Sequence, residues 1–131
     1  MSEARARLDD LPKRYPHLFV YGPLFWGFEV GDGWSDLIVA LFARIDASIK
    51  DVPTAKFGVR QVKEKFGALR FYYQLSGVHE SIQEDVSQLV RLAEAASART
   101  CERCGRPGEI NSDGGWLSAR GEDCRGRAWN E

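Results

Sequence analysis

Cysteine, histidine and methionine are scarce in this chain, with three, two and one residues among 131. So few cysteines do not fit the disulfide framework of a small secreted protein. Two of them stand in a Cys-x-x-Cys pair, which favours metal or thiol chemistry in a reducing compartment. We therefore expect an intracellular, cytoplasmic protein.

Long apolar runs are also missing. The longest, Leu37 to Ala43, is far too short to span a bilayer. The N-terminus is polar and carries no apolar segment typical of a secretion signal. No fixed-period repeat and no low-complexity segment is present, and the length fits one compact domain.

Neither sign of charge is in excess, because 18 basic and 19 acidic residues give a formal net charge of −1. Proteins built mainly to bind nucleic acid usually carry a clear basic excess, so the overall charge disfavours that role. Nucleotide-binding loops, nucleophile elbows and the His-Glu-x-x-His motif are absent. An active site assembled from residues distant in the sequence remains open, since only geometry could reveal it.

Hydrophobic periodicity predicts three well-defined elements. Apolar residues at helical spacing predict amphipathic helices over residues 35–50 and 78–98, the second starting at Ser81 if a capping box forms. Alternation with period two predicts a β-hairpin over residues 58–75, with Gly67 in its turn. We expect an α+β fold in which these two main helices pack on a small antiparallel sheet, made of the hairpin plus a short strand.

The first third of the chain gives weaker signals. A faint helical stripe is expected to stop at Pro12, because proline inside a helix is costly. Trp26, Phe28 and Val30 alternate with polar or small residues and predict the short half-buried strand. Trp34, just before a helix, is expected to plug the core, and tryptophans in general are expected to pack inside.

Residues 99–131 differ in composition from residues 1–98, which we take as the core domain. The segment holds all three cysteines, six arginines and six glycines, but no lysine. Ile110 and Leu117 are its only large aliphatic residues, so it cannot build a core of its own. It must pack on the core domain, bind a metal or stay disordered.

Cys101, Cys104 and Cys124 are the candidate metal ligands. Two cysteines three positions apart can bind one tetrahedral Zn²⁺ from a tight turn, as in a zinc knuckle. Position 127, where a fourth ligand would complete the pattern, holds Arg127. Zinc binding and unmetallated thiols therefore both stay open. Other candidates for the fourth ligand are Glu122, Asp123, Asp113, the terminal carboxylate, water, His17 and His79.

Basic and aromatic residues supply candidate binding positions. The hairpin cations Lys63, Lys65 and Arg70 are interleaved with aromatic residues and could contact bases, phosphates or a protein. The same cations are also typical of an ordinary solvated face that discourages edge pairing, and the balanced net charge favours this interpretation. Near the C-terminus, Arg125 and Arg127 are further candidates, and Trp129 is a candidate contact anchor.

Three segments resemble an uncharacterised family of small proteins from bacteria and their phages. They are VKEKFGALRFY at Val62–Tyr72, the Gly31–Trp34 segment before a helix, and Ser97–Gly108 with Gly114–Trp116 beyond it. The family pattern ends in Cys-x-x-His, and this chain departs from it at Arg127. The resemblance implies a C-terminal knuckle and a mobile-element context, and it implies no activity.

Together these features predict a non-enzymatic protein-binding accessory factor. The resemblance alone implies that it is a phage or prophage modulator or inhibitor of a bacterial defence machine. The balanced charge and the tryptophans suit protein contact better than duplex binding. Two alternatives stay open. One is a zinc-knuckle protein that binds nucleic acid, and the other is a small metal-dependent enzyme with an open coordination position.

Overall fold

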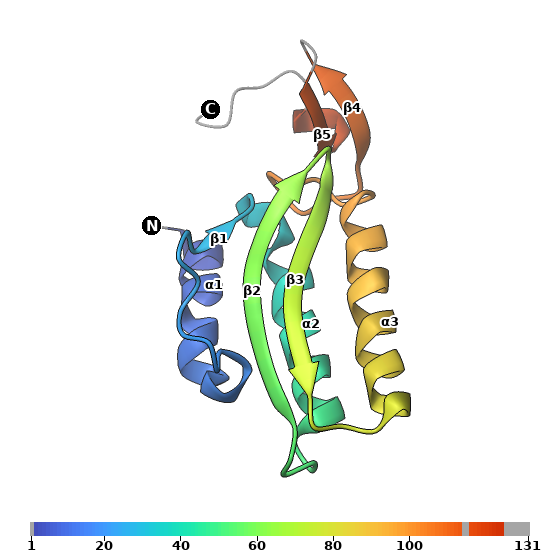
Figure 1. The fold of residues 1–131 in the computed structure, drawn as a ribbon. Coiled ribbons are helices and arrows are strands. Elements are labelled where there is room, and N and C mark those ends of the chain that lie inside the picture. Colours follow the sequence, from blue (N-terminus) through green and yellow to red (C-terminus); the bar gives the residue numbers. More distant parts are fainter. Residues whose placement is uncertain (1, 114–115, 125–131) are drawn as a thin grey trace.

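The computed structural model describes residues 2–113 and 116–124 and confirms the α+β class (Figure 1). Single turns of 3₁₀ helix lie at Pro16–Leu18, Asp32–Trp34 and Glu122–Cys124. The longer elements are α1 (Glu3–Arg14), β1 (Phe28–Glu29), α2 (Ser35–Ile49), β2 (Lys56–Lys65), β3 (Ala68–Ser76), α3 (Glu80–Ser97), β4 (Glu109–Asp113) and β5 (Trp116–Arg120).

Strands β1, β2 and β3 form one sheet in that order, and β4 and β5 form a separate hairpin. The β2–β3 hairpin is antiparallel, as predicted. Strand β1 joins β2 in parallel, with Phe28 opposite Val62, because the chain passes through α2 before it returns as β2. The hairpin turns through Phe66 and Gly67, both at positive φ, a conformation that glycine adopts without strain.

A β-bulge at Arg60 changes which residues of β2 face the core. Val59 pairs with Tyr73 and Gln61 pairs with Tyr72, so Arg60 has no partner of its own in the ladder. Strict alternation would place Val59 and Val62 on opposite faces, yet both are buried. The expected alternation is therefore wrong for β2, because the extra residue moves all the side chains after it to the opposite face of the sheet.

Helix α2 lies behind the sheet and supplies the centre of the core (Figure 1). The ring of Phe42 is fully buried, and its centroid lies 5.5 Å from that of Phe19 and 5.6 Å from that of Phe71. Phe28 of β1 approaches it edge to face at 6.2 Å. Each ring of this kind contributes about 1.5–3 kcal/mol through burial, so the aromatic cluster fixes the sheet on α2.

Helix α1 does not stop at Pro12, contrary to the sequence expectation. Pro12 lies in the last turn and α1 ends at Arg14, so the missing N–H removes only one hydrogen bond near the helix end. Leu8 and Leu11 are completely buried against the rest of the core. Their burial offsets the cost of the proline.

Helix α3 starts one residue before the predicted capping box. His79 is its N-cap, and the Nδ1 atom of His79 accepts a hydrogen bond from the backbone N–H of Ser81 at 3.1 Å. The prediction that Ser81 caps α3 is therefore wrong, because the histidine side chain satisfies the free N–H first.

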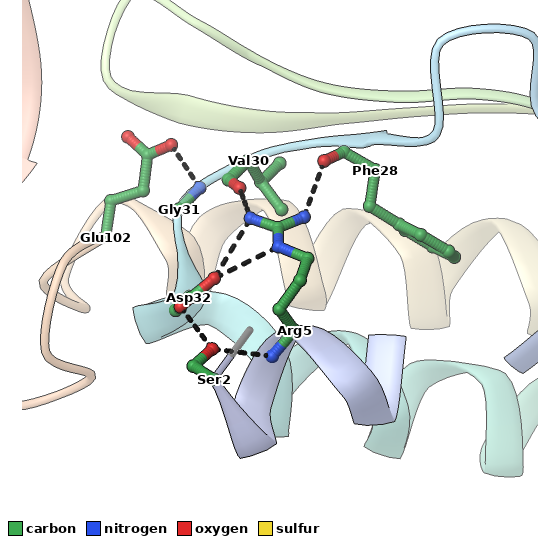
Figure 2. A network of polar contacts seen from close by, with 7 residues as sticks. All are labelled: Ser2, Arg5, Phe28, Val30, Gly31, Asp32 and Glu102. Atoms are coloured by element: carbon green, nitrogen blue, oxygen red, sulfur yellow. Dashed lines mark hydrogen bonds and ion pairs between the residues drawn. The ribbon is translucent and has the colours of Figure 1, made fainter. Parts of the chain in front are cut away.

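The outer edge of β1 is covered by one side chain of α1 (Figure 2). The guanidinium of Arg5 donates to the carbonyl oxygens of Phe28 at 2.8 Å and Val30 at 2.5 Å. It also pairs with the Asp32 carboxylate, which accepts a further hydrogen bond from the hydroxyl of Ser2 at 2.6 Å. Arg5 thus satisfies carbonyl groups that could otherwise accept hydrogen bonds from the backbone of another strand.

Helix α3 covers the opposite edge, along β3. The Ser97 hydroxyl accepts from the backbone N–H of Leu69 at 2.8 Å, and the Glu94 carboxylate accepts from that of Phe71 at 3.0 Å. The side chain of Gln83 donates to the carbonyl of Leu75 at 2.7 Å. Side chains therefore take up backbone groups at both edges of the sheet, and a single bridge to Phe19 covers Gly58 of β2.

Candidate metal centre and the open face of the sheet

The structure brings together all three predicted cysteines. The Sγ atoms of Cys101, Cys104 and Cys124 lie within 4.8 Å of one another. Cys101 and Cys104 come from the turn after α3, and Cys124 comes from the 3₁₀ turn after β5. Cys101 and Cys124 are buried, whereas Cys104 is exposed. Three thiolates at this separation could hold a metal ion.

The backbone of the turn shapes this cluster. The N–H of Gly105 donates to the carbonyl of Cys101 at 2.9 Å, and Gly105 takes the positive φ of 80° that this tight turn needs. The N–H of Cys101 donates to the carbonyl of Arg106 at 2.7 Å. These bonds hold the two cysteines of the pair on one side of the turn.

The β4–β5 hairpin returns the chain to the cluster. It was missed in the sequence, although Asp-Gly-Gly at residues 113–115 is a typical turn signal. Ala119 of β5 is completely buried, and its carbonyl accepts the N–H of Glu102 at 2.9 Å. The hairpin therefore packs on the cysteine turn and delivers Cys124 to it.

The thiols of the cluster differ in acidity. Burial would raise the pKa of the Cys101 thiol, but backbone N–H groups of Gly121, Cys104 and Arg103 point at it and lower the pKa to about 7. Burial, reinforced by the two neighbouring sulfur atoms, raises the pKa of Cys124 to about 11. The thiolate of Cys101 thus forms readily, whereas a metal cation would have to displace the proton of Cys124.

No fourth ligand joins the cluster among residues 2–113 and 116–124 whose side chains are described. Glu122 is described and stays outside it. His17 pairs with Asp46 in α2, and His79 caps the start of α3. The side chains of Asp113 and Asp123 lie outside the described part of the chain.

The cysteine turn sits directly on the segment before α2, as Figure 2 shows for Glu102 and Gly31. The Glu102 carboxylate accepts from the N–H of Gly31 at 2.9 Å, and the Glu102 carbonyl accepts from that of Gly33 at 2.8 Å. The indole Nε1 of the fully buried Trp34 donates to the carbonyl of Thr100 at 2.9 Å. Trp34 thus plugs the core as predicted and also ties α2 to the cysteine turn.

Glu102 is a buried carboxyl group, with 4% of the residue exposed. Burial raises its pKa to about 7, the N–H of Gly31 acts against this shift, the charge of Glu64 adds to it, and Arg120 opposes it. The carboxyl group beside the metal site is therefore partly protonated near neutral pH.

The predicted hairpin cations lie on the face of the sheet that is turned away from α2, which we call the open face. Lys63 of β2 stands directly opposite Arg70 of β3. Lys65 lies at the end of β2, with its Nζ 5.5 Å from the ring centroid of Phe66. The other predicted binding residues, Arg125, Arg127 and Trp129, lie outside the described residues.

Exposed aromatic residues border the open face, and no spacing pattern in the sequence marks them as one surface. The expectation that Trp26 packs inside is wrong, because the residue is 71% exposed and its neighbour Phe25 is 86% exposed. The two rings contact each other edge to face, with centroids 4.6 Å apart. The reason is the short length of β1, which starts only at Phe28 and leaves Trp26 in the preceding turn.

Tyr21 and Tyr72 complete this surface. Tyr21 lies over Gly58, where a Cβ atom would come within 1.8 Å of the tyrosine ring. The guanidinium carbon of Arg60, the bulge residue, lies 3.8 Å from the Tyr21 ring centroid. A glycine in a strand is a recognisable signal of close approach, but the sequence does not say which side chain approaches.

Comparison with known proteins adds no relative: no protein-family model, no curated protein and no solved structure matches this chain. Within the described residues, none of the helices has the length and apolar character needed to cross a membrane.

Proposed function

We propose that this chain is a non-enzymatic protein-binding factor whose partner contacts the open face of the three-stranded sheet. The observation that carries the proposal is the exposure of Phe25 and Trp26, at 86% and 71%. Large aromatic side chains grouped at the surface mark interaction sites, and tryptophan, tyrosine and arginine dominate the energy of protein interfaces. Tyr72 and Arg60 lie beside the pair and line the same hollow.

The hydrogen bonding of the sheet edges supports the face as the contact surface. A partner that added a strand would need free N–H and carbonyl groups at an edge. Arg5 already covers carbonyls of β1, and Glu94 and Ser97 already accept N–H groups of β3. Helix α2 occupies the inner face, which leaves the outer face for a partner (Figure 1).

The same proposal assigns Zn²⁺ to Cys101, Cys104 and Cys124, with a structural role. Zinc–sulfur bonds of about 2.3 Å in a tetrahedron place sulfur atoms about 3.8 Å apart, which fits within the observed 4.8 Å. Backbone N–H groups directed at Cys101 favour its thiolate form, which is the form that binds metal. The last position of four-coordinate zinc falls to water or to a group outside the described residues.

Protein purified without chelator or affinity-tag metal is expected to carry one zinc ion per chain in native mass spectrometry. The variant Cys101→Ser should carry none, while His79→Ala, which changes a histidine used only as a helix cap, should keep the ion. At free zinc about one hundred times its Kd, the bound ion should stabilise the fold by about 2.7 kcal/mol. A metal-free wild-type protein with unchanged thermal stability after zinc addition would overturn the assignment.

Loss of the aromatic pair should abolish partner capture. We expect proteins cross-linked to the wild-type chain in a bacterial lysate to fall at least tenfold in yield with the double variant Phe25→Ser, Trp26→Ala, because hot-spot aromatics contribute 2 kcal/mol or more each. The matched control is Leu92→Ala, a change at another exposed apolar residue, 54% exposed on α3. Equal capture by all three proteins would place the partner elsewhere.

The biological role that we propose is a cytoplasmic phage or prophage accessory factor that modulates or inhibits a bacterial defence machine. Its support is the resemblance carried by the hairpin segment Val62–Tyr72 and the Gly31–Trp34 segment. In the fold these two segments supply the open face and the seat of the cysteine turn. A surface for contact and a metal-stabilised support suit a binding factor.

One specific observation favours a second candidate, the binding of single-stranded nucleic acid. Lys63 and Arg70 lie side by side on the open face, next to Tyr72, and such cation–aromatic surfaces bind single strands. This candidate predicts that the protein is retained on oligo(dT) at low salt and released as salt rises. Absence of retention at the lowest salt tested would rule it out.

A further inference from the structure

A hollow of about 320 Å³ lies on the open face. Its assignment as the point of contact with a partner rests on the proposed function. The turn before β1 supplies Leu24 and Trp26 to its wall, and the sheet supplies Arg60 and Tyr72. Its volume is at the lower limit of pockets that enclose small ligands, about 300 Å³. The hollow also opens to solvent, so it suits one large apolar side chain that a partner presents.

Two tyrosine rings at the hollow and beside it already carry a cation. The Arg60 guanidinium carbon lies 3.8 Å from the Tyr21 ring centroid, and the Lys63 Nζ lies 5.9 Å from that of Tyr72. Trp26 meets its neighbour Phe25 at an interplanar angle of 84°. Bases bind by stacking flat on ring faces, so a single strand would have to share the rings of Tyr21 and Tyr72 with these cations.

The same contacts prepare the cations for a protein ligand. Arg60 is held by the Tyr21 ring and by two hydrogen bonds to the Oε1 atom of Gln74. A guanidinium already ordered in this way loses little freedom when it binds a carboxylate. In the part of the chain that the structure describes, no carboxylate forms an ion pair with Arg60, Lys63 or Arg70.

Charge on the open face is strongly one-sided, although the whole chain carries −1. Among the residues that the structure describes, Glu29 is the one carboxylate that lines the hollow, and it accepts a hydrogen bond from Gln61. The acids that balance these cations lie mostly on other parts of the chain. The cations of the open face and its rim are Lys56, Arg60, Lys63, Lys65 and Arg70.

We infer that the open face binds an acidic segment of a partner protein, with one large apolar side chain in the hollow and flanking carboxylates on Arg60, Lys63 and Arg70. The apolar contact with Trp26 and Tyr72 supplies affinity, and the carboxylates supply orientation and selectivity. The partner is thus defined by a short acidic motif around one hydrophobic residue.

Panning a random twelve-residue peptide display library on the folded protein tests this inference. Peptides that bind are expected to carry Leu, Ile, Phe or Trp within three positions of at least two Asp or Glu residues. Synthetic peptides with this motif should bind Arg60→Glu at least tenfold more weakly than wild type, which corresponds to about 1.4 kcal/mol. The control variant Leu92→Ala should bind them as wild type does, and circular dichroism should confirm that both variants are folded.

Other outcomes would overturn the inference in different ways. Enrichment of basic peptides, or no enrichment, would reject the acidic motif. The proposed function would still survive if capture of a partner depends on Trp26. Tight binding of oligo(dT) that Tyr72→Ala abolishes would reject the inference and the protein-binding function together. An acidic motif whose affinity is unchanged in Arg60→Glu would place the ligand away from this face.

Discussion

A protein with alanine in place of Gly33 is expected to lose roughly 3 kcal/mol of its free energy of unfolding, the upper range for overpacking. A Cβ atom at this position would lie 2.2 Å from the carbonyl oxygen of Cys101 and 2.6 Å from the backbone nitrogen of Gly105. Both atoms belong to the backbone, so no side-chain rotation can relieve the clash. The cysteine turn must move away from α2, and the hydrogen bond from Gly33 to Glu102 is then lost.

Urea unfolding would measure the loss of stability. A zinc titration would measure whether the displaced cysteine turn binds zinc more weakly. The matched control is Gly22→Ala, because a Cβ atom at Gly22 meets nothing within 4 Å and only its φ of 95° opposes the change. Backbone strain of that kind costs about 1 kcal/mol. Gly22 is also far from the three cysteines in sequence, so zinc affinity should not change. Equal effects of the two substitutions, with unchanged zinc affinity, would show that the cysteine turn does not rest on Gly33 in solution.

Replacement of Glu102 by glutamine is expected to stabilise the metal-free protein at pH 8 and to change little at pH 5. Burial raises the pKa of Glu102 from 4.5 to about 7, so the folded protein holds a proton that the unfolded chain releases. Its contribution is fully present below pH 4.5 and is lost as the pH rises through 7. The difference corresponds to roughly 3 kcal/mol at pH 8.

Glutamine keeps the acceptor for the Gly31 N–H but cannot ionise, so Glu102→Gln should flatten the decrease in stability between pH 5 and pH 8. The measurement is urea unfolding at both pH values in buffer with chelator, which excludes competition between metal and protons. Glu84→Gln serves as the control, because that carboxylate is largely exposed on α3. A pH profile of Glu102→Gln parallel to that of wild type would contradict the assignment.

The elements with strong periodicity could be predicted from the sequence, because burial of one face is the force that sets the period. Helix α2 and the β2–β3 hairpin follow directly from their apolar spacing. The bulge at Arg60 could not be predicted. One extra residue changes which side chains face the core, and no residue type in this segment signals it. The β4–β5 hairpin has Ile110, Trp116 and Leu117 as its large apolar residues, and these do not alternate along either strand, so no periodic signal arises.

The metal centre was predictable in part for a similar reason. The spacing of Cys101 and Cys104 is set by the geometry of one local turn, which a sequence displays directly. The position of Cys124 depends on the β4–β5 hairpin and became certain only in three dimensions. The small size of Gly31 and Gly33 lets the cysteine turn approach, a contact between segments about 70 residues apart that no local pattern indicates.

The covered edges of the sheet also govern how the chain behaves toward copies of itself. An uncovered edge strand is a template on which identical chains stack into aggregates, and a short exposed sheet with aromatic residues would be prone to this. Arg5 occupies one edge and Glu94 the other, each through a charged side chain that an incoming strand would have to displace and desolvate. The chain can therefore display exposed aromatic residues on its open face without offering these edge groups to the backbone of a second copy.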